Sequence, residues 1–134
     1  MANPNIVNVT SIYGNTAYVI PSTTAATTSW TYNGTTALTG LTPASGSVHR
    51  VTSITVSNTT SSAATCTIGV GNNATFGSAT VVSYPAYQIS VPANATLIVV
   101  DKTVSLYITE NQSIGVTSGT ASALTYTATF EIIT

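Results

Sequence analysis

Near its C-terminus the chain reads Leu124-Thr125-Tyr126-Thr127-Ala128-Thr129-Phe130-Glu131-Ile132, the clearest structural signal in the sequence. Apolar and polar residues alternate along it, so that the leucine, tyrosine, alanine, phenylalanine and isoleucine share one face and the threonines and the glutamate share the other. A period of two residues is that of a β-strand with one face against a core and one face toward water. The pattern predicts a long, half-buried antiparallel strand.

Two further segments show the same alternation. Ala64, Cys66, Ile68 and Val70 form one apolar series, and residues 48–56 contain another, with Ile54 facing inward. Thr, Val, Ile and Tyr are abundant and the strong helix formers are scarce, a composition typical of pleated sheets. We expect about eight to ten short strands and no significant helix, in an all-β antiparallel sandwich of the jelly-roll kind.

Turn residues separate the alternating segments. Asn33-Gly34 lies between Tyr32 and Thr35 and predicts a type I′ hairpin, because both residue types tolerate positive φ. Pro85 interrupts an apolar run, which favours an edge strand or a break. Arg50 has the same parity as the inward Ile54, so we expect it to be solvated at a strand end rather than held in a buried ion pair.

The chain fits a single domain over residues 1–134, with a loop-rich portion at 21–47 that surrounds the small hairpin. The single cysteine, Cys66, has no internal partner and is in phase with apolar neighbours, which predicts a buried, inert thiol. The N-terminus has no basic region followed by an apolar stretch, so we expect synthesis and folding in a cytoplasm.

Charge is the most unusual property of the composition. The 134 residues include two basic and three acidic side chains, 4% of the chain, with a formal net charge of −1; an average soluble domain is about a quarter charged. Two basic residues provide no face for nucleic acid, and neither a polybasic segment nor an apolar run of bilayer length indicates a membrane.

Catalysis is also poorly supported. Asp101 and Glu110 could approach each other as the carboxylate pair of a glycosidase, but their simpler interpretation is that they mark exposed turns. One histidine, His49, and one cysteine do not supply the three or four ligands of a zinc site. We therefore expect no enzyme activity, no metal and no cofactor.

Aromatic residues near turns are the remaining candidates for a contact site. Trp30 and Tyr32 share one face of the predicted hairpin arm, and Tyr13 and Tyr18 flank a tight turn at Gly14. Exposed aromatics bury a large area at small entropic cost and often anchor protein contacts. The alternative for each of the four is that its ring simply caps the core.

The second half of the chain resembles a group of small β-sandwich structural proteins from the virions of tailed bacteriophages, especially those of cyanobacteria and other marine bacteria. Three segments carry the resemblance: 89–102 (ISVPANATLIVVDK), 106–118 (LYITENQSIGVTS) and 124–133 (LTYTATFEII). The similarity spans roughly residues 48–134. Where the family is expected to have Gly-Asp, this chain has Asn111-Gln112, which removes a charge from one turn.

The resemblance implies a β-sandwich virion component present in many copies, with no catalytic residue to transfer. One interpretation is a capsid decoration or cement protein that binds the major capsid protein or other virion proteins and braces the shell. Another is a tail, neck or fibre module that contacts host polysaccharide or protein. A third is a lectin-like accessory domain outside any virus. A nearly neutral domain with open sheet edges is expected to close into a homo-oligomer, with threefold symmetry favoured.

Overall fold

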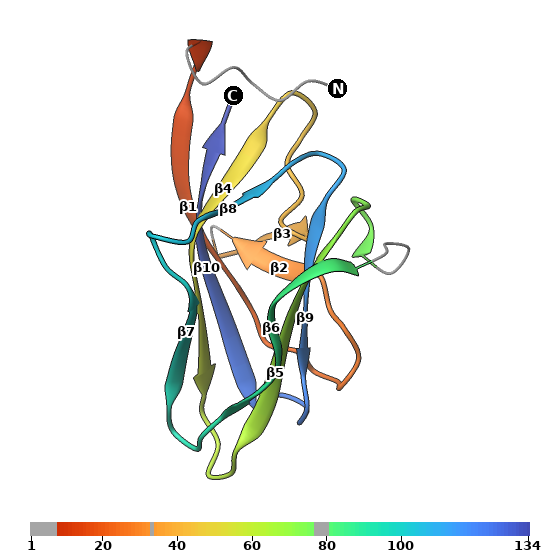
Figure 1. The fold of residues 1–134 in the computed structure, drawn as a ribbon, viewed down its shortest axis with the longest axis vertical. Helices are drawn as coiled ribbons and strands as arrows, with labels where there is room; N and C mark the ends of the chain where they lie inside the picture. Colours follow the sequence, from red (N-terminus) through yellow and green to blue (C-terminus); the bar gives the residue numbers. More distant parts are fainter. Residues whose placement is uncertain (1–7, 33, 77–80) are drawn as a thin grey trace.

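The computed structural model describes residues 8–32, 34–76 and 81–134, which form two antiparallel sheets that face each other as a β-sandwich (Figure 1). The larger sheet contains β1 (Ile12–Val19), β2 (Ser29–Tyr32), β3 (Thr36–Thr39), β4 (Val48–Asn58), β7 (Thr96–Val100), β8 (Leu106–Ile108) and β10 (Leu124–Ile133). The smaller sheet contains β5 (Ala64–Gly71), β6 (Val81–Val91) and β9 (Ser113–Ser118). These ten strands confirm the predicted all-β sandwich, and the described residues contain no α-helix.

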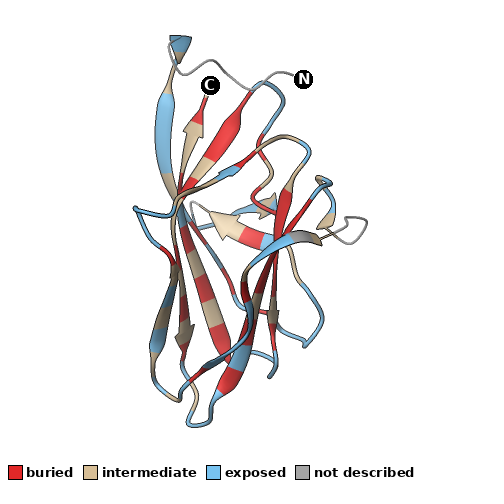
Figure 2. Cartoon of the chain, in the orientation of Figure 1, coloured by how far each residue is buried: buried red, intermediate tan, exposed pale blue. Residues whose placement is uncertain are grey.

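β10 lies at the centre of the larger sheet, whose strand order is β3-β2-β1-β10-β4-β7. β8 pairs with the first part of β4, and β7 pairs with its last part. The alternation along β10 is as predicted: Leu124, Tyr126, Ala128 and Phe130 are each 0% exposed. Buried and half-buried bands alternate along this strand in Figure 2. The core therefore sits between β10 and the facing strand β5, whose Cys66 and Ile68 are also fully buried.

A bulge reverses the phase of β4. The register with β10 shifts between Thr129 and Phe130, which pair with Ser53 and Val51, so Thr52 is the extra residue. An extra residue puts the side chains before it out of phase with those after it, so Arg50 and Ile54 face opposite sides of the sheet despite their equal parity. Arg50 therefore points outward, where Nη1 lies 3.6 Å from Oε2 of Glu131 and the two side chains are 34% and 35% exposed. As expected, Arg50 is not held in a buried ion pair, but it is not simply solvated near a strand end either, because it pairs with Glu131 at the surface.

The hairpin between β2 and β3 is confirmed, but its turn is longer than predicted. Tyr32 pairs with Thr36 rather than with Thr35, and Gly34 has a φ of 77°. Asn33, the other residue of the predicted type I′ turn, lies outside the described residues. Pro85 lies within β6, an edge strand of the smaller sheet. Of the two outcomes predicted for it, an edge strand or a break, the structure shows the edge strand.

The loop-rich portion at 21–47 closes one side of the sandwich. Thr27 forms an antiparallel bridge with Val116 of β9, and the carbonyl of Gly40 accepts a hydrogen bond of 2.7 Å from the amide of Ile114. β9 is an edge strand of its own sheet, so these bonds satisfy part of its free edge. The segment predicted as loops around a hairpin thus also joins the two sheets.

Candidate functional site

The four aromatic candidates do not form one site. Trp30 is 0% exposed, and its Nε1 donates a hydrogen bond of 3.2 Å to the carbonyl of Ile114. Tyr32 is half-buried, with its ring edge-on to Phe130 at a centroid distance of 6.4 Å. Both residues therefore cap the core, the alternative left open for them, and Trp30 is not available as a surface anchor. Tyr13 and Tyr18 are exposed, at 63% and 43%, but both lie within the continuous strand β1, so the tight turn predicted at Gly14 was wrong.

The outer face of the larger sheet is covered by small hydroxyl side chains, and we call it the threonine face. Its residues, identified by register and alternation, are Thr16, Tyr18, Arg50, Ser53, Thr55, Ser57, Thr96, Ile98, Tyr107, Thr125, Thr127, Thr129 and Glu131. Tyr18 and Ile98 lie in one row of register partners across the sheet, which we call a rung, with Thr127 and Thr55 between them. Ile98 is 65% exposed and Tyr107 51%. This face carries apolar groups in water with only the Arg50–Glu131 pair charged.

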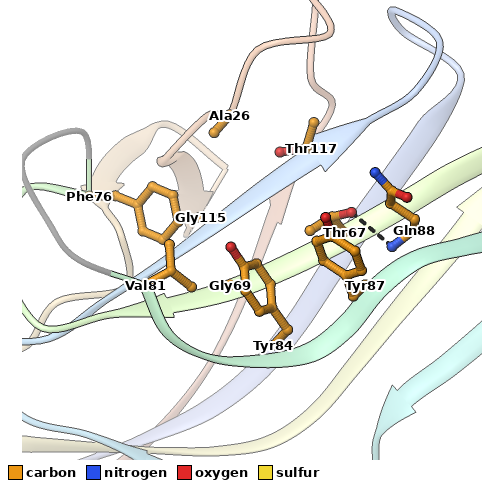
Figure 3. A pocket seen from close by; sticks show the side chains of 10 residues that line it. All are labelled: Ala26, Thr67, Gly69, Phe76, Val81, Tyr84, Tyr87, Gln88, Gly115 and Thr117. Carbon is orange, nitrogen blue, oxygen red and sulfur yellow. Dashed lines mark hydrogen bonds between the residues drawn. The ribbon is translucent and has the colours of Figure 1, made fainter.

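A cleft of about 270 Å³ lies on the other side of the molecule, on the outer face of the smaller sheet (Figure 3). β6 forms one wall with its tyrosines, and Ala26 of the 21–47 portion stands on the opposite side. Its lining residues are Ala26, Thr67, Gly69, Phe76, Val81, Tyr84, Tyr87, Gln88, Gly115 and Thr117. None of these lining side chains carries a charge.

A pair of glycines forms part of the cleft floor. Gly69 and Gly115 are register partners on β5 and β9. The ring of Phe76 lies over them, so that a Cβ atom added to Gly115 would be 2.6 Å from the ring, and one added to Gly69 would be 3.2 Å from it. The absence of side chains at both positions therefore lets Phe76 fold back onto the sheet and close one end of the cleft.

Tyr84 and Tyr87 form the aromatic wall. Their ring centroids are 4.9 Å apart with an interplanar angle of 67°, and the residues are 50% and 58% exposed. Residues three apart on a regular strand face opposite sides. Both tyrosines line the cleft because the register between β5 and β6 shifts around Ile68 and its partner Ala86.

Gln88 continues this irregularity at the end of the cleft. It adopts a positive φ of 51°. Its backbone amide donates a hydrogen bond of 3.0 Å to Oγ1 of Thr67, and its side-chain amide stands at the end of the cleft beyond Tyr87 (Figure 3). Three polar side chains, those of Thr67, Gln88 and Thr117, thus accompany the aromatic rings.

The groups considered for catalysis are dispersed. His49 on β4 is 3% exposed, and its Nδ1 donates a hydrogen bond of 2.8 Å to the carbonyl of Leu41; burial lowers its pKa. Cys66 lies in the other sheet, on β5, and burial raises the pKa of its thiol, as predicted for an inert cysteine. These two groups are not arranged as a nucleophile and its base.

The acidic side chains occupy turns and the threonine face. Asp101 accepts hydrogen bonds from the amide and the hydroxyl of Thr103, at 2.9 and 2.6 Å, and these bonds lower its pKa. Glu110 lies in the turn before β9. Within residues 8–32, 34–76 and 81–134, no three His, Cys, Asp or Glu side chains are grouped as metal ligands. No helix in this part of the chain is long and apolar enough to span a membrane.

Comparisons of the chain with protein-family models, with curated proteins and with solved structures found no match. The threonine face and the cleft are therefore characterised by their own residues. The cleft was not predicted, although the sequence contains one signal of it: Gly69 and Gly115 occupy outward positions of two strands, where the absence of a side chain permits the close approach of another group.

Proposed function

We propose that this chain is a non-enzymatic structural protein of a tailed-bacteriophage virion, a decoration protein that binds the outer capsid shell and braces it. The observation that supports this most directly is the threonine face, where Tyr18, Ile98 and Tyr107 are exposed on a surface with one ion pair. The β-sandwich fold and the resemblance of residues 48–134 to phage structural proteins agree with the proposal. Its location is then the virion, after synthesis in the host cytoplasm.

The mechanism follows from the cost of burying such a surface. Hydroxyl groups of threonine and serine can exchange hydrogen bonds with water for hydrogen bonds with a partner, and they avoid the large penalty of burying charge. The exposed rings and aliphatic side chains add apolar area. Each contact is weak, but a copy that touches several shell subunits binds its later sites at a high effective concentration. The partner is the major capsid protein or another virion protein.

Self-association is part of the same proposal. β3 is a terminal strand of the larger sheet and three of its four residues are exposed. With a net charge of −1, little electrostatic repulsion opposes the pairing of such edges. A closed, threefold oligomer would bury the edges that an open chain of copies would leave free. Light scattering that finds a stable monomer at high concentration would contradict the oligomer.

Copy number on purified particles tests the location. Quantitative mass spectrometry against the major capsid protein should find on the order of hundreds of copies per particle, as collective bracing of a shell requires. About a dozen copies or fewer would instead support the alternative function, a tail, neck or fibre module that contacts the host surface. Absence from every assembled particle, with turnover of a substrate by the isolated chain, would contradict both and favour an accessory domain outside a virus.

A further inference from the structure

We propose that the cleft between Phe76, Tyr84, Tyr87 and Gln88 binds one ring of a neutral sugar. This inference concerns the face opposite the threonine face and does not depend on where the chain sits on a particle. The cleft measures about 270 Å³, slightly below the range of roughly 300 to 1,000 Å³ of pockets for drug-sized ligands. Its size therefore suits a single ring or the end of a glycan rather than an extended ligand.

The aromatic wall provides the apolar part of the recognition. Tyr84 and Tyr87 meet edge to face, an arrangement that presents two ring surfaces at an angle, and about half of each residue is exposed. A sugar ring has one face rich in C–H groups, which pack against an aromatic ring, and a rim of hydroxyl groups. Tyrosine also carries a hydroxyl of its own beside its apolar ring surface. The wall therefore matches both parts of a sugar.

The polar side chains match the sugar hydroxyls. Thr67 Oγ1 accepts the bond from the Gln88 amide, which leaves the hydroxyl hydrogen of Thr67 for another acceptor. Thr117 stands across the cleft floor from Tyr84 (Figure 3). Gln88 adds an amide that both donates and accepts. A hydroxyl-rich ligand needs both hydrogen-bond donors and hydrogen-bond acceptors from the protein, and the cleft offers both.

The absence of charged side chains in the lining favours neutral over anionic hydroxyl-rich ligands. The lining side chains are apolar, hydroxyl or amide groups. A sulfated sugar, a uronate or a phosphate would lose hydration on entering the cleft without gaining a cationic partner. The proposed ligand is therefore a neutral hexose or N-acetylhexosamine.

The edge of β6 argues against a peptide strand as the occupant. Strand addition needs a regular edge with free backbone donors and acceptors. Pro85 has no N–H group, Gln88 has left-handed backbone geometry, and the register with β5 shifts at several positions. These irregularities interrupt the edge that an added strand would pair with.

The test is an NMR titration of the isotope-labelled full chain. The probes are maltoheptaose, cellohexaose, mannopentaose and chitotetraose, with polygalacturonate as the anionic probe. At least one neutral probe should shift the amide signals of Gly69, Gly115, Thr117 and Gln88 and the ring signals of Tyr84 and Tyr87. Tyr87→Ala should weaken the binding about two- to twelvefold, as expected for loss of one aromatic contact.

Matched variants make the result decisive. Tyr107→Ala removes a tyrosine of similar exposure, 51% against 58%, from the opposite face and should leave the affinity unchanged. Thr117→Val keeps the shape of the side chain but removes its hydroxyl, and should weaken binding without a change in fold. Neutral-probe shifts in the cleft that depend on Tyr87 and Thr117 but not on Tyr107 support the proposal.

Several results would overturn it. These are an absence of shifts with every neutral probe, shifts confined to other surfaces, binding only of polygalacturonate, and equal loss of affinity in Tyr87→Ala and Tyr107→Ala. Shifts at the cleft that depend on protein concentration in the absence of sugar would identify a second copy as the occupant. Copy number on particles is measured independently, so a failure here is distinct from a failure of the proposed decoration function.

Discussion

Trp30 on β2 and Ile114 on β9 connect the two sheets: the indole Nε1 donates a hydrogen bond of 3.2 Å to the Ile114 carbonyl. The amide of the same Ile114 donates to the carbonyl of Gly40, at 2.7 Å. Both backbone hydrogen-bonding groups of Ile114 are thus bonded to the 21–47 portion. The indole is also the largest fully buried side chain among the described residues, so it combines packing with a link between the sheets.

Trp30 should therefore contribute to stability rather than to partner binding. Trp30→Ala should lower the free energy of unfolding by about 3 to 5 kcal/mol, the usual cost of truncating a buried tryptophan. Trp30→Phe keeps a ring but leaves the Ile114 carbonyl without its donor, and should cost less than the alanine variant. Urea denaturation at neutral pH measures both changes.

Tyr13→Ala is the control for Trp30, because Tyr13 is 63% exposed. Its effect should stay within about 0.5 kcal/mol, as for most surface substitutions. Equal stability of the Trp30→Ala and Tyr13→Ala variants would show that the indole does not join the sheets in solution.

Gly115→Ala should destabilise the domain through overpacking. The new methyl group would lie 2.6 Å from ring atoms of Phe76, and overpacking of this kind costs about 1 to 3 kcal/mol. Gly14→Ala is the matched control, since nothing lies within 4 Å of a Cβ atom there and Gly14 is also in a strand. The measurement is again the free energy of unfolding.

A double-mutant cycle identifies the cause of the Gly115→Ala effect. Phe76→Ala removes the ring, so the added methyl group should cost little in that background, with a coupling of about 0.5 to 3 kcal/mol between the two sites. Additive effects of the two substitutions would mean that Phe76 does not lie over the glycine pair.

The fold was predictable from the sequence because its signal is local. Alternation in β10 reports burial directly, since one face of that strand meets the core and the other meets water. The buried Cys66 and the edge position of Pro85 follow from equally local rules. Such rules depend on a residue and its neighbours in the chain, which the sequence displays.

The features that the sequence did not reveal have a different origin, because they depend on partners distant in sequence. A bulge opposite Phe130 turns Arg50 toward Glu131, and nothing in residues 48–56 alone marks the extra residue. Trp30 is buried because β9 lies against it. The sequence of its hairpin arm alone does not distinguish a buried tryptophan from an exposed one. The cleft was missed for the same reason: Tyr84 and Tyr87 share a face through register shifts against β5.

His49 should make the protein less stable in mild acid. Its ring packs against Phe130 at 5.0 Å and donates to the Leu41 carbonyl, and burial lowers its pKa. The unfolded chain takes up a proton near pH 6.5, while the folded chain stays neutral to lower pH. Because the unfolded state then binds more protons, the free energy of unfolding should fall as pH drops below about 6.5, by at most about 1.4 kcal/mol per pH unit.

Urea denaturation between pH 7.5 and 5 in His49→Gln tests this effect. The chain has a single histidine, and the pKa of Asp101 is lowered, so the loss of its ionised form occurs at still lower pH. The variant should be less stable at pH 7.5 but should lose the fall in stability between pH 6.5 and 5. An unchanged slope would show that another group causes the acid sensitivity.

The proposed decoration function predicts that attachment to the capsid depends on the rung that joins Tyr18 to Ile98 on the threonine face. The two residues are 43% and 65% exposed, and the positions between them are threonines. Tyr18→Ser with Ile98→Thr removes most of the apolar area of this rung, while the unfolding free energy should change by about 1 kcal/mol or less, about 0.5 kcal/mol for each surface substitution. Occupancy on particles, measured by mass spectrometry after assembly with the variant, should fall severalfold, because the losses of affinity at the several sites that one copy touches multiply.

The control is Tyr87→Ser, on the opposite face and 58% exposed, which should keep the occupancy of the unmodified chain. Full occupancy of the double variant, or an equal loss of occupancy in Tyr87→Ser, would contradict the proposal that the threonine face binds the shell.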